Sequence, residues 1–200
     1  MLEHLAAIPD DVSWMTPAER LLLFSLVLSL RPRWYLEIGT FKGGSALIAC
    51  AAMNAAENRE GKLILIDPNA QIAPEHWSFL EERSLLIKEP SPAALRCIPP
   101  EARGQIAFAL IDGDHSFQGA LSDARAVLPL MCPGGMMVFH DGFYDEVRRA
   151  IDQFVQEHTD QVTDYGLFSR EYVGQVLEDG QQVKWGGLRL VFVRGASTLT

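Results

Sequence analysis

Acidic and histidine side chains follow several apolar runs of the chain, at the points where β-strands are expected to end. These residues are Glu37, Asp67, Asp112, Asp114, His115, His140 and Asp141. Carboxylates bind cations and sugar hydroxyls, and imidazole exchanges protons near neutral pH. Any one of these residues could cap a helix or face solvent. Together they predict a polar site at one edge of a sheet.

The run YLEIGTFKGGS, residues 35–45, places a glycine-rich turn between a strand-like and a helix-like segment. A phosphate-binding P-loop would need a lysine where Ser45 stands, and the dinucleotide pattern G-x-G-x-x-G is absent. The acid-glycine-glycine-serine spacing suits a ligand without phosphate. Glu37 can hold the ammonium group of an amino acid, and Gly39 and Gly43 let the backbone approach a crowded ligand.

Asp67 ends the next strand-like run, KLILIDP. In dinucleotide-binding folds an acid at this point binds both ribose hydroxyls. An amino acid joined to a ribose without phosphate describes S-adenosylmethionine. The sequence therefore predicts this cofactor, and the failed glycine spacing disfavours a dinucleotide oxidoreductase.

Helical and strand-like patterns alternate along most of the chain. Helices are expected over residues 16–30, 43–58, 74–84, 91–98, 116–131 and 145–159. Strands are expected over residues 34–38, 62–68, 85–89, 106–114 and 135–141, with a terminal hairpin around the Asp179-Gly180 turn. Thr16, Pro17 and Glu19 form a strong helix start with a capping box. This alternation predicts an α/β fold, a doubly wound parallel sheet with an antiparallel edge.

Composition limits the function classes. The 200 residues suit one domain, and the net charge of −9 comes with no basic cluster larger than Arg148-Arg149, so we expect no nucleic-acid partner. The chain contains no run of about 18 apolar residues, so we expect no membrane span. We also expect no signal peptide. Cys50, Cys97 and Cys132 are scattered and odd in number, so we expect no disulfide framework. We therefore expect the protein to lie in a reducing cytoplasm.

Four segments resemble motifs of the class I S-adenosylmethionine-dependent methyltransferases. They are LEIGTFKGGS, LILIDP, IAFALIDGDHSFQGALSD and LPLMCPGGMMVFHD. The chain is most similar to the catechol-type, caffeoyl-coenzyme-A-type and macrolide-sugar O-methyltransferases, from Thr16 to Arg194. The resemblance implies a single methyltransferase domain over 1–200, with an N-terminal helical segment (1–33) and a cofactor-binding core (34–200). It also implies a Rossmann-like sheet of seven strands with an antiparallel C-terminal strand, and methyl transfer to a hydroxyl oxygen of a small acceptor.

The resemblance also assigns roles to residues. It implies that cofactor is bound by Glu37, Gly39, Thr40, Gly43, Ser45, Asp67, Ser91 and Asp112. Asp112, His140 and Asp141 match metal ligands, for Mg²⁺ or Mn²⁺, although His140 departs from the family pattern. His115 matches the general base. The alternatives are that Ser91-Pro92 and the His140-Asp141 pair cap helices, and that His115 faces solvent.

Other expectations concern the surroundings of the site. Asp114 either binds the cofactor or caps the following helix, and Asp123 is expected to face solvent. The aromatic residues expected to wall a substrate pocket are Trp77, Phe143, Tyr144 and Trp185. The short N-terminal segment has no large lid, so we expect a homodimer to close the site. The rival functions are a hydroxylase-like or otherwise repurposed relative and a non-catalytic cofactor-binding subunit.

Overall fold

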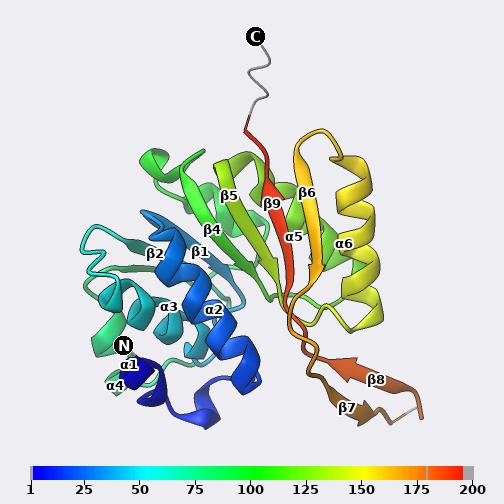
Figure 1. The fold of residues 1–200 in the computed structure, drawn as a ribbon, viewed down its shortest axis with the longest axis horizontal. Helices are drawn as coiled ribbons and strands as arrows, with labels where there is room; N and C mark the ends of the chain where they lie inside the picture. Colours follow the sequence, from blue (N-terminus) through cyan, green and yellow to red (C-terminus); the bar gives the residue numbers. More distant parts are fainter. Residues whose placement is uncertain (1, 179, 196–200) are drawn as a thin grey trace.

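The centre of the computed structural model, which describes residues 2–178 and 180–195, is a seven-stranded sheet in the order β3-β2-β1-β4-β5-β9-β6 (Figure 1). Strands β1 to β5 pair in parallel, and β9 is antiparallel to both of its neighbours. The strands are β1 (Trp34–Ile38), β2 (Lys62–Ile66), β3 (Ser84–Ile87), β4 (Ile106–Ile111), β5 (Met131–Phe139), β6 (Val162–Leu167) and β9 (Arg189–Val193). The predicted doubly wound α/β fold with seven strands, mostly parallel, is confirmed.

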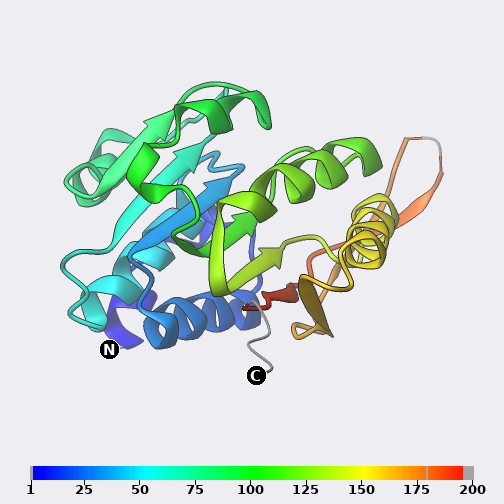
Figure 2. The ribbon, with the colours of Figure 1, turned by 90° about the horizontal axis from the view of Figure 1, so that it is seen from above.

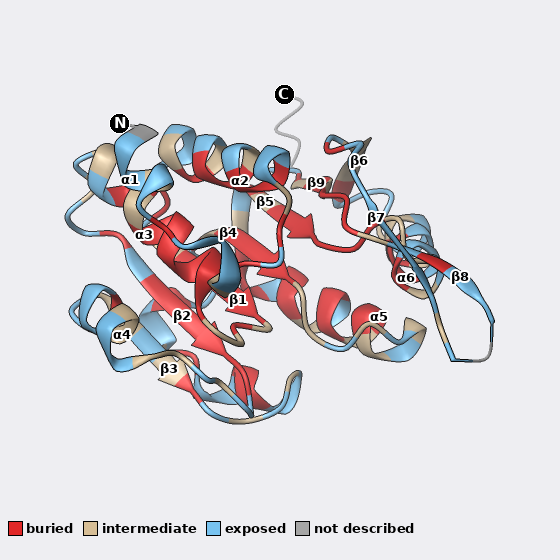
Figure 3. Cartoon of the chain, turned by 90° about the horizontal axis from the view of Figure 1, so that it is seen from below, coloured by how far each residue is buried: buried red, intermediate tan, exposed pale blue. Residues whose placement is uncertain are grey.

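Helices cover both faces of this sheet (Figures 2 and 3). One face packs against α1 (Leu2–Ala6), α2 (Pro17–Leu30), α3 (Gly44–Ala55) and α4 (Pro74–Leu80), the other against α5 (Phe117–Val127) and α6 (Asp145–Glu157). Neighbouring strand residues point to opposite faces, so Tyr35 lies in the first core and Leu36 in the second. None of the described helices has the length and apolarity to cross a bilayer.

Helix α2 begins with the predicted capping box. The Thr16 hydroxyl accepts a hydrogen bond from the Glu19 amide at 3.3 Å, and the Glu19 carboxylate accepts one from the Thr16 amide at 2.8 Å. Arg31 ends the helix in the left-handed conformation (φ 48°) just before Pro32. The helix start fixes the chain that precedes it, and that segment lines the cavity described below.

Several elements differ from the sequence-based expectation. Residues Ala93–Cys97 form a 3₁₀ turn rather than an α-helix, and further 3₁₀ turns occupy Asp10–Val12, Pro100–Ala102 and Leu128–Leu130. Helix α5 ends at Val127 because Pro129 has no amide proton to continue the helical ladder. Strand β5 therefore starts at Met131, before the Pro-Gly-Gly segment that was expected to separate helix and strand. Strand β6 was not expected from the sequence.

The terminal hairpin does not form the edge of the main sheet. Strands β7 (Val173–Val176) and β8 (Gln182–Trp185) pair only with each other among the described residues and project from the sheet (Figure 1). The antiparallel strand β9 instead lies between β5 and β6. Asp179 of the predicted Asp179-Gly180 turn lies outside the described residues.

Candidate functional site

A cavity of about 900 Å³ opens at the carboxyl ends of β1 to β5. The segment before α2, strand β7 and the end of β8 complete its wall. The residues named from the sequence that line it are Gly39, Thr40, Ser45, Asp67, Ser91, Asp112, Asp114, His115, His140 and Asp141. Residues that follow five different strands therefore meet at one end of the sheet, as expected for an open α/β fold.

Glu37 lies at the end of β1, fully buried beneath the cavity lining. Its Oε2 accepts a hydrogen bond from the Tyr35 hydroxyl at 2.8 Å, and its Oε1 has no hydrogen-bond partner within the described chain. Burial raises the pKa of Glu37 to about 7, although the Tyr35 hydrogen bond acts against this rise. A buried carboxylate with a free oxygen is suited to a cationic partner, which would restore the ionised form.

The turn after β1 brings the backbone unusually close to the end of β4. Gly39 has φ 90°, and a Cβ atom there would lie 1.8 Å from the carbonyl oxygen of Asp112. A side chain at Gly44, the first residue of α3, would meet the Val12 carbonyl oxygen at 2.3 Å. The glycines thus permit close packing of the turn against β4 and against the segment before α2. Gly43 precedes α3 in the left-handed conformation (φ 85°) and does not itself line the cavity.

Asp67 follows β2 and is held in place by the backbone. The Phe41 amide donates to Oδ2 at 2.7 Å, and the Asn69 amide donates to Oδ1 at 2.6 Å. Each carboxylate oxygen can accept a second hydrogen bond. The side chain lines the cavity next to Gly39 and Thr40. Its orientation is therefore fixed, and acceptor capacity remains for a ligand. The assignment to ribose hydroxyls stays a prediction.

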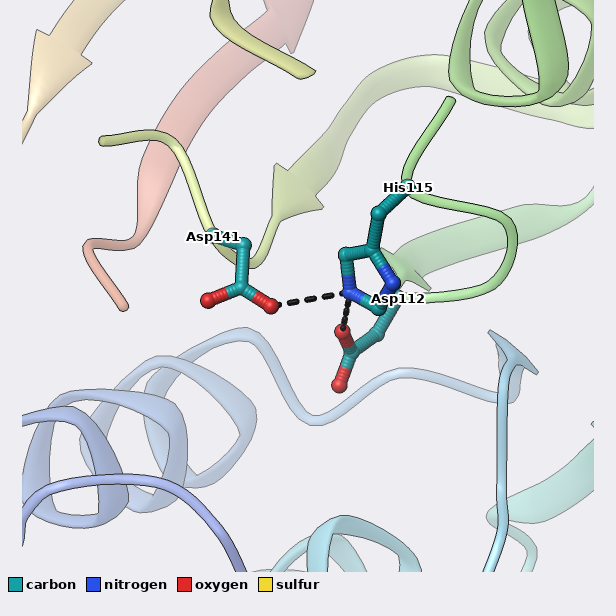
Figure 4. A group of neighbouring side chains, drawn as sticks. All are labelled: Asp112, His115 and Asp141. Carbon is teal, nitrogen blue, oxygen red and sulfur yellow. Dashed lines mark ion pairs between the residues drawn. The ribbon is translucent and has the colours of Figure 1, made fainter. Parts of the chain in front are cut away.

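His115 lies against the carboxylates of Asp112 and Asp141 at the centre of the site (Figure 4). His140 faces the same two carboxylates. His115 Nε2 lies 2.8 Å from Asp141 Oδ2 and 3.4 Å from Asp112 Oδ1. His140 Nδ1 lies 3.1 Å from Asp112 Oδ1 and 3.2 Å from Asp141 Oδ2. His115 was expected three residues beyond the predicted metal ligand Asp112, and the fold brings it into direct contact with that carboxylate.

Asp112, His115 and Asp141 offer ligand atoms that all lie within 4.8 Å of one another, which is close enough to share a metal ion. This set contains His115 where the sequence predicted His140. His140 Nδ1 faces the same two carboxylates. The predicted role of His140 as a metal ligand stays a prediction. Two carboxylate oxygens with an imidazole nitrogen suit Mg²⁺ less well than Mn²⁺, Fe²⁺ or Zn²⁺.

The carboxylates control the protonation of both imidazoles. Asp112 and Asp141 raise the pKa of His115 to about 10. His140 is almost fully buried, which by itself would lower its pKa, but Asp112 and the other facing carboxylates raise it well above the usual value. Burial would raise the pKa of Asp141, yet the contacts with His115, His140 and the Gly186 amide together outweigh it and lower the pKa. Without a further cation, both rings are therefore protonated at neutral pH.

Glu19 is a site residue that the sequence identified only as part of a helix cap. Its fully buried side chain accepts a hydrogen bond from the Gly187 amide, and its Oε2 lies 3.7 Å from His140 Nε2. Burial by itself would raise the pKa of Glu19, but His140 and the hydrogen bonds from the Thr16 and Gly187 amides together outweigh it and lower this pKa. Only the capping-box spacing signalled this residue. Its reach to β9 and β5 depends on tertiary packing.

Aromatic residues frame the outer part of the cavity. Trp185 at the end of β8 lies on the wall, stacks on Tyr144 at 4.4 Å between ring centroids, and meets the His115 ring edge-on at 5.6 Å. Trp14 and Phe41, 5.1 Å apart, form a second part of the wall that the sequence did not indicate. Of the four aromatic residues expected there, only Trp185 lines the cavity. The hairpin thus contributes directly to the site.

Asp123 was expected to face solvent, and this is wrong. Its side chain is 1% exposed, and its Oδ2 accepts a hydrogen bond of 2.9 Å from the Ser91 hydroxyl. Asp123 lies on the buried face of α5. The sequence pattern alone did not show that this residue belongs to the buried face and not to the polar face. Ser91 itself lines the cavity, and its role in cofactor binding stays a prediction.

Comparison with known proteins agrees with this geometry. Residues 36–142 match the model of a family described as a methyltransferase domain. No curated protein matches the chain.

Solved structures share the fold. An O-methyltransferase from Bacillus cereus in complex with SAH is 18% identical in sequence, with a TM-score of 0.64. The match covers 96% of this chain and 88% of the Bacillus cereus chain. The O-methyltransferase TomG from Streptomyces achromogenes, involved in tomaymycin synthesis and bound to SAM, is 19% identical, with a TM-score of 0.64. That match covers 97% of this chain and 87% of TomG. Precorrin-6y C5,15-methyltransferase from Geobacter metallireducens is 15% identical, with a TM-score of 0.58, and the match covers 94% of this chain and 98% of that protein's chain.

Proposed function

The chain belongs to the methyltransferase-domain family, and we propose that it transfers a methyl group from S-adenosylmethionine to a hydroxyl oxygen of a small molecule, with a divalent cation assisting. The observation that carries the proposal is the cavity itself. A glycine turn, with the part-unpaired Glu37 buried beneath it, lies beside Asp112, His115 and Asp141, which are within metal-binding distance of one another. Cofactor and acceptor groups would therefore share one space.

The residues present fit the cofactor. The unpaired Oε1 of Glu37 can accept the ammonium group of the methionine part, and the fixed carboxylate of Asp67 can accept the ribose hydroxyls. Gly39 lets the turn pack against the Asp112 carbonyl oxygen. The carboxylates of Glu37 and Asp67 would hold the amino acid and the ribose at neighbouring strand ends. Two of the structurally similar proteins were solved with SAM or SAH.

A cation fits the donor set of Asp112, Asp141 and one or both histidines. When bound, it would offset the charge of the two carboxylates and polarise the acceptor oxygen. If Asp112, Asp141 and His140 held the cation, its charge would lower the raised pKa of His115, and Nε2 of the unprotonated His115 ring would then accept the hydroxyl proton. Trp185 packs against the His115 ring and limits its movement. The chain otherwise contributes alignment of the acceptor oxygen with the methyl group.

The acceptor is proposed to be a hydroxylated small molecule. The O-methyltransferases among the similar structures support oxygen as the target, whereas the precorrin methyltransferase shows that this fold also occurs in a protein named for methylation at C5 and C15. The three cysteines are free, which supports the proposed reducing, cytoplasmic location. The homodimer stays a prediction.

The first test is calorimetric titration with SAM or SAH after chelation, repeated with Mg²⁺, Mn²⁺ and Zn²⁺. We expect one cofactor per chain, and a separate metal heat that disappears in Asp141→Ala. Transfer of labelled methyl groups to a panel of phenols and sugars, with products read by mass spectrometry, then separates O-methyl from C-methyl products. Failure to bind SAM and SAH under every condition would refute the proposal and favour a non-catalytic role.

A further inference from the structure

The two ring nitrogens of His140 face different groups. Nδ1 lies 3.1 Å from Asp112 Oδ1 and 3.2 Å from Asp141 Oδ2, whereas Nε2 lies 3.7 Å from Glu19 Oε2. The ring is almost fully buried, and Nε2 has no hydrogen-bond partner among the described residues. An unpaired buried polar group lowers stability, so the placement of this nitrogen beside a buried carboxylate calls for an explanation.

The backbone holds both oxygens of the Glu19 carboxylate. Oε2 accepts a hydrogen bond from the Thr16 amide at 2.8 Å, and Oε1 accepts one from the Gly187 amide. Thr16 precedes α2 and Gly187 precedes β9, so two segments that are far apart in the chain fix the same fully buried carboxylate. A helix cap needs only the contacts with Thr16. The contacts with Gly187 and His140 therefore go beyond the capping role.

Histidines that bind metal ions commonly donate their second ring N–H to a carboxylate, which fixes the tautomer and the orientation of the ring. A cation held by Asp112 and Asp141 would meet the lone pair of His140 Nδ1. The ring would then keep its one proton on Nε2, the nitrogen that faces Glu19. At 3.7 Å this contact is electrostatic and longer than a hydrogen bond. The arrangement is that of a carboxylate, a histidine and a metal site in sequence.

We propose that Glu19 orients the His140 ring so that Nδ1 binds the divalent cation, and that this nitrogen makes the site select Mn²⁺, Co²⁺ or Zn²⁺ over Mg²⁺. Glu19 acts through His140 and is a positioning residue. Imidazole nitrogen suits these transition metals, whereas Mg²⁺ prefers oxygen ligands. The capping residue of α2 thereby has a second role, in a site formed at the ends of β4 and β5. The inference rests on the proposed cation-assisted methyl transfer.

The experiment measures the dissociation constants of Co²⁺ and Mg²⁺ by calorimetry on the full chain after chelation. Wild type, Glu19→Gln, His140→Asn and the double variant form a double-mutant cycle. Glutamine keeps the size of the side chain, but its amide nitrogen cannot accept a hydrogen bond. Thr16→Ala is the matched control, because it removes the hydroxyl of the cap and keeps both amide contacts of the Glu19 carboxylate.

We expect Glu19→Gln and His140→Asn each to weaken Co²⁺ binding by about 10- to 100-fold, and Mg²⁺ binding by less than about threefold. The preference for Co²⁺ should therefore fall. The double variant should lose no more Co²⁺ affinity than His140→Asn alone, because Glu19 acts through this ring. Thr16→Ala should keep the wild-type preference. If Glu19→Gln does not fold, Glu19→Asp takes its place, since its shorter side chain withdraws the carboxylate from His140.

Several results would overturn the inference. If Glu19→Gln keeps the preference for Co²⁺, or has the same effect with and without His140→Asn, Glu19 does not act through His140. If Thr16→Ala lowers the preference equally, the effect is that of the helix cap. If His140→Asn keeps the preference, His140 does not supply the nitrogen ligand.

Binding of SAH, measured on the same samples, separates the inference from the proposed function. If SAH binds and neither metal does, the inference is wrong, while methyl transfer without a metal stands. If neither SAH nor either metal binds, the proposed function is refuted together with the inference.

Discussion

Replacing Glu37 with glutamine should make the cofactor-free protein progressively more stable than the wild type as the pH rises. The Glu37 side chain is fully buried, and its pKa is raised from 4.5 to about 7, mainly by burial. A carboxyl group whose pKa is raised by folding stabilises the protein below about pH 4.5. That contribution is lost as the pH rises through 7. Glutamine does not titrate, so the variant is free of this loss.

The magnitude follows from the size of the pKa shift. At 1.36 kcal/mol per pKa unit, a rise from 4.5 to about 7 corresponds to about 3 kcal/mol in total, of which roughly 2–3 kcal/mol falls between pH 5 and 8. The amide of glutamine introduces its own cost, because its hydrogens face the position where Oε1 has no described partner. That cost does not depend on pH. The change in the stability difference between pH 5 and pH 8 therefore isolates the titration.

The assay is urea unfolding of both proteins at several pH values with a chelator present, and the exposed Glu60→Gln is the control for deleting one negative charge. The difference between Glu37→Gln and wild type should shift toward the variant by about 2–3 kcal/mol from pH 5 to pH 8. A shift below about 1 kcal/mol would refute the buried-carboxylate reasoning. The same variant should bind SAH about tenfold or more weakly, because the ammonium group loses its ionised partner.

Five further substitutions test the remaining parts of the site. Asp67→Ala should weaken SAH binding about tenfold in calorimetry, and unchanged affinity would exclude this residue from the ribose contact. Asp112→Ala and Asp141→Ala should each abolish the heat of metal binding; a variant that keeps this heat removes its residue from the ligand set. Gly39→Ala should cost more than about 2 kcal/mol in urea unfolding, since its Cβ would overlap a backbone oxygen. Glu19→Ala should cost about 2–3 kcal/mol by leaving a buried amide unpaired, and a loss below 0.5 kcal/mol would show that the cap is dispensable.

Local spacing in the sequence was sufficient to predict the glycine-rich turn after β1, the α2 cap and the strand ends that carry polar residues. These features depend on backbone rules that act over a few residues. A glycine is needed where the turn packs against β4, and a threonine three residues before a glutamate closes a helix start. Because parallel strands share one carboxyl edge, the sequence also predicted that Asp112, His115 and Asp141 would lie together.

Only the tertiary structure decided which groups touch. Glu19 and Gly187 are 168 residues apart in the chain, and Asp123 and Ser91 are 32 apart, so no local pattern relates them. The insertion of β9 between β5 and β6 places the hairpin beside the site, which brings Trp185 onto the His115 ring. Burial and partner geometry, which set the proton directions and pKa values of these groups, are properties of the packed chain and not of its residue spacing.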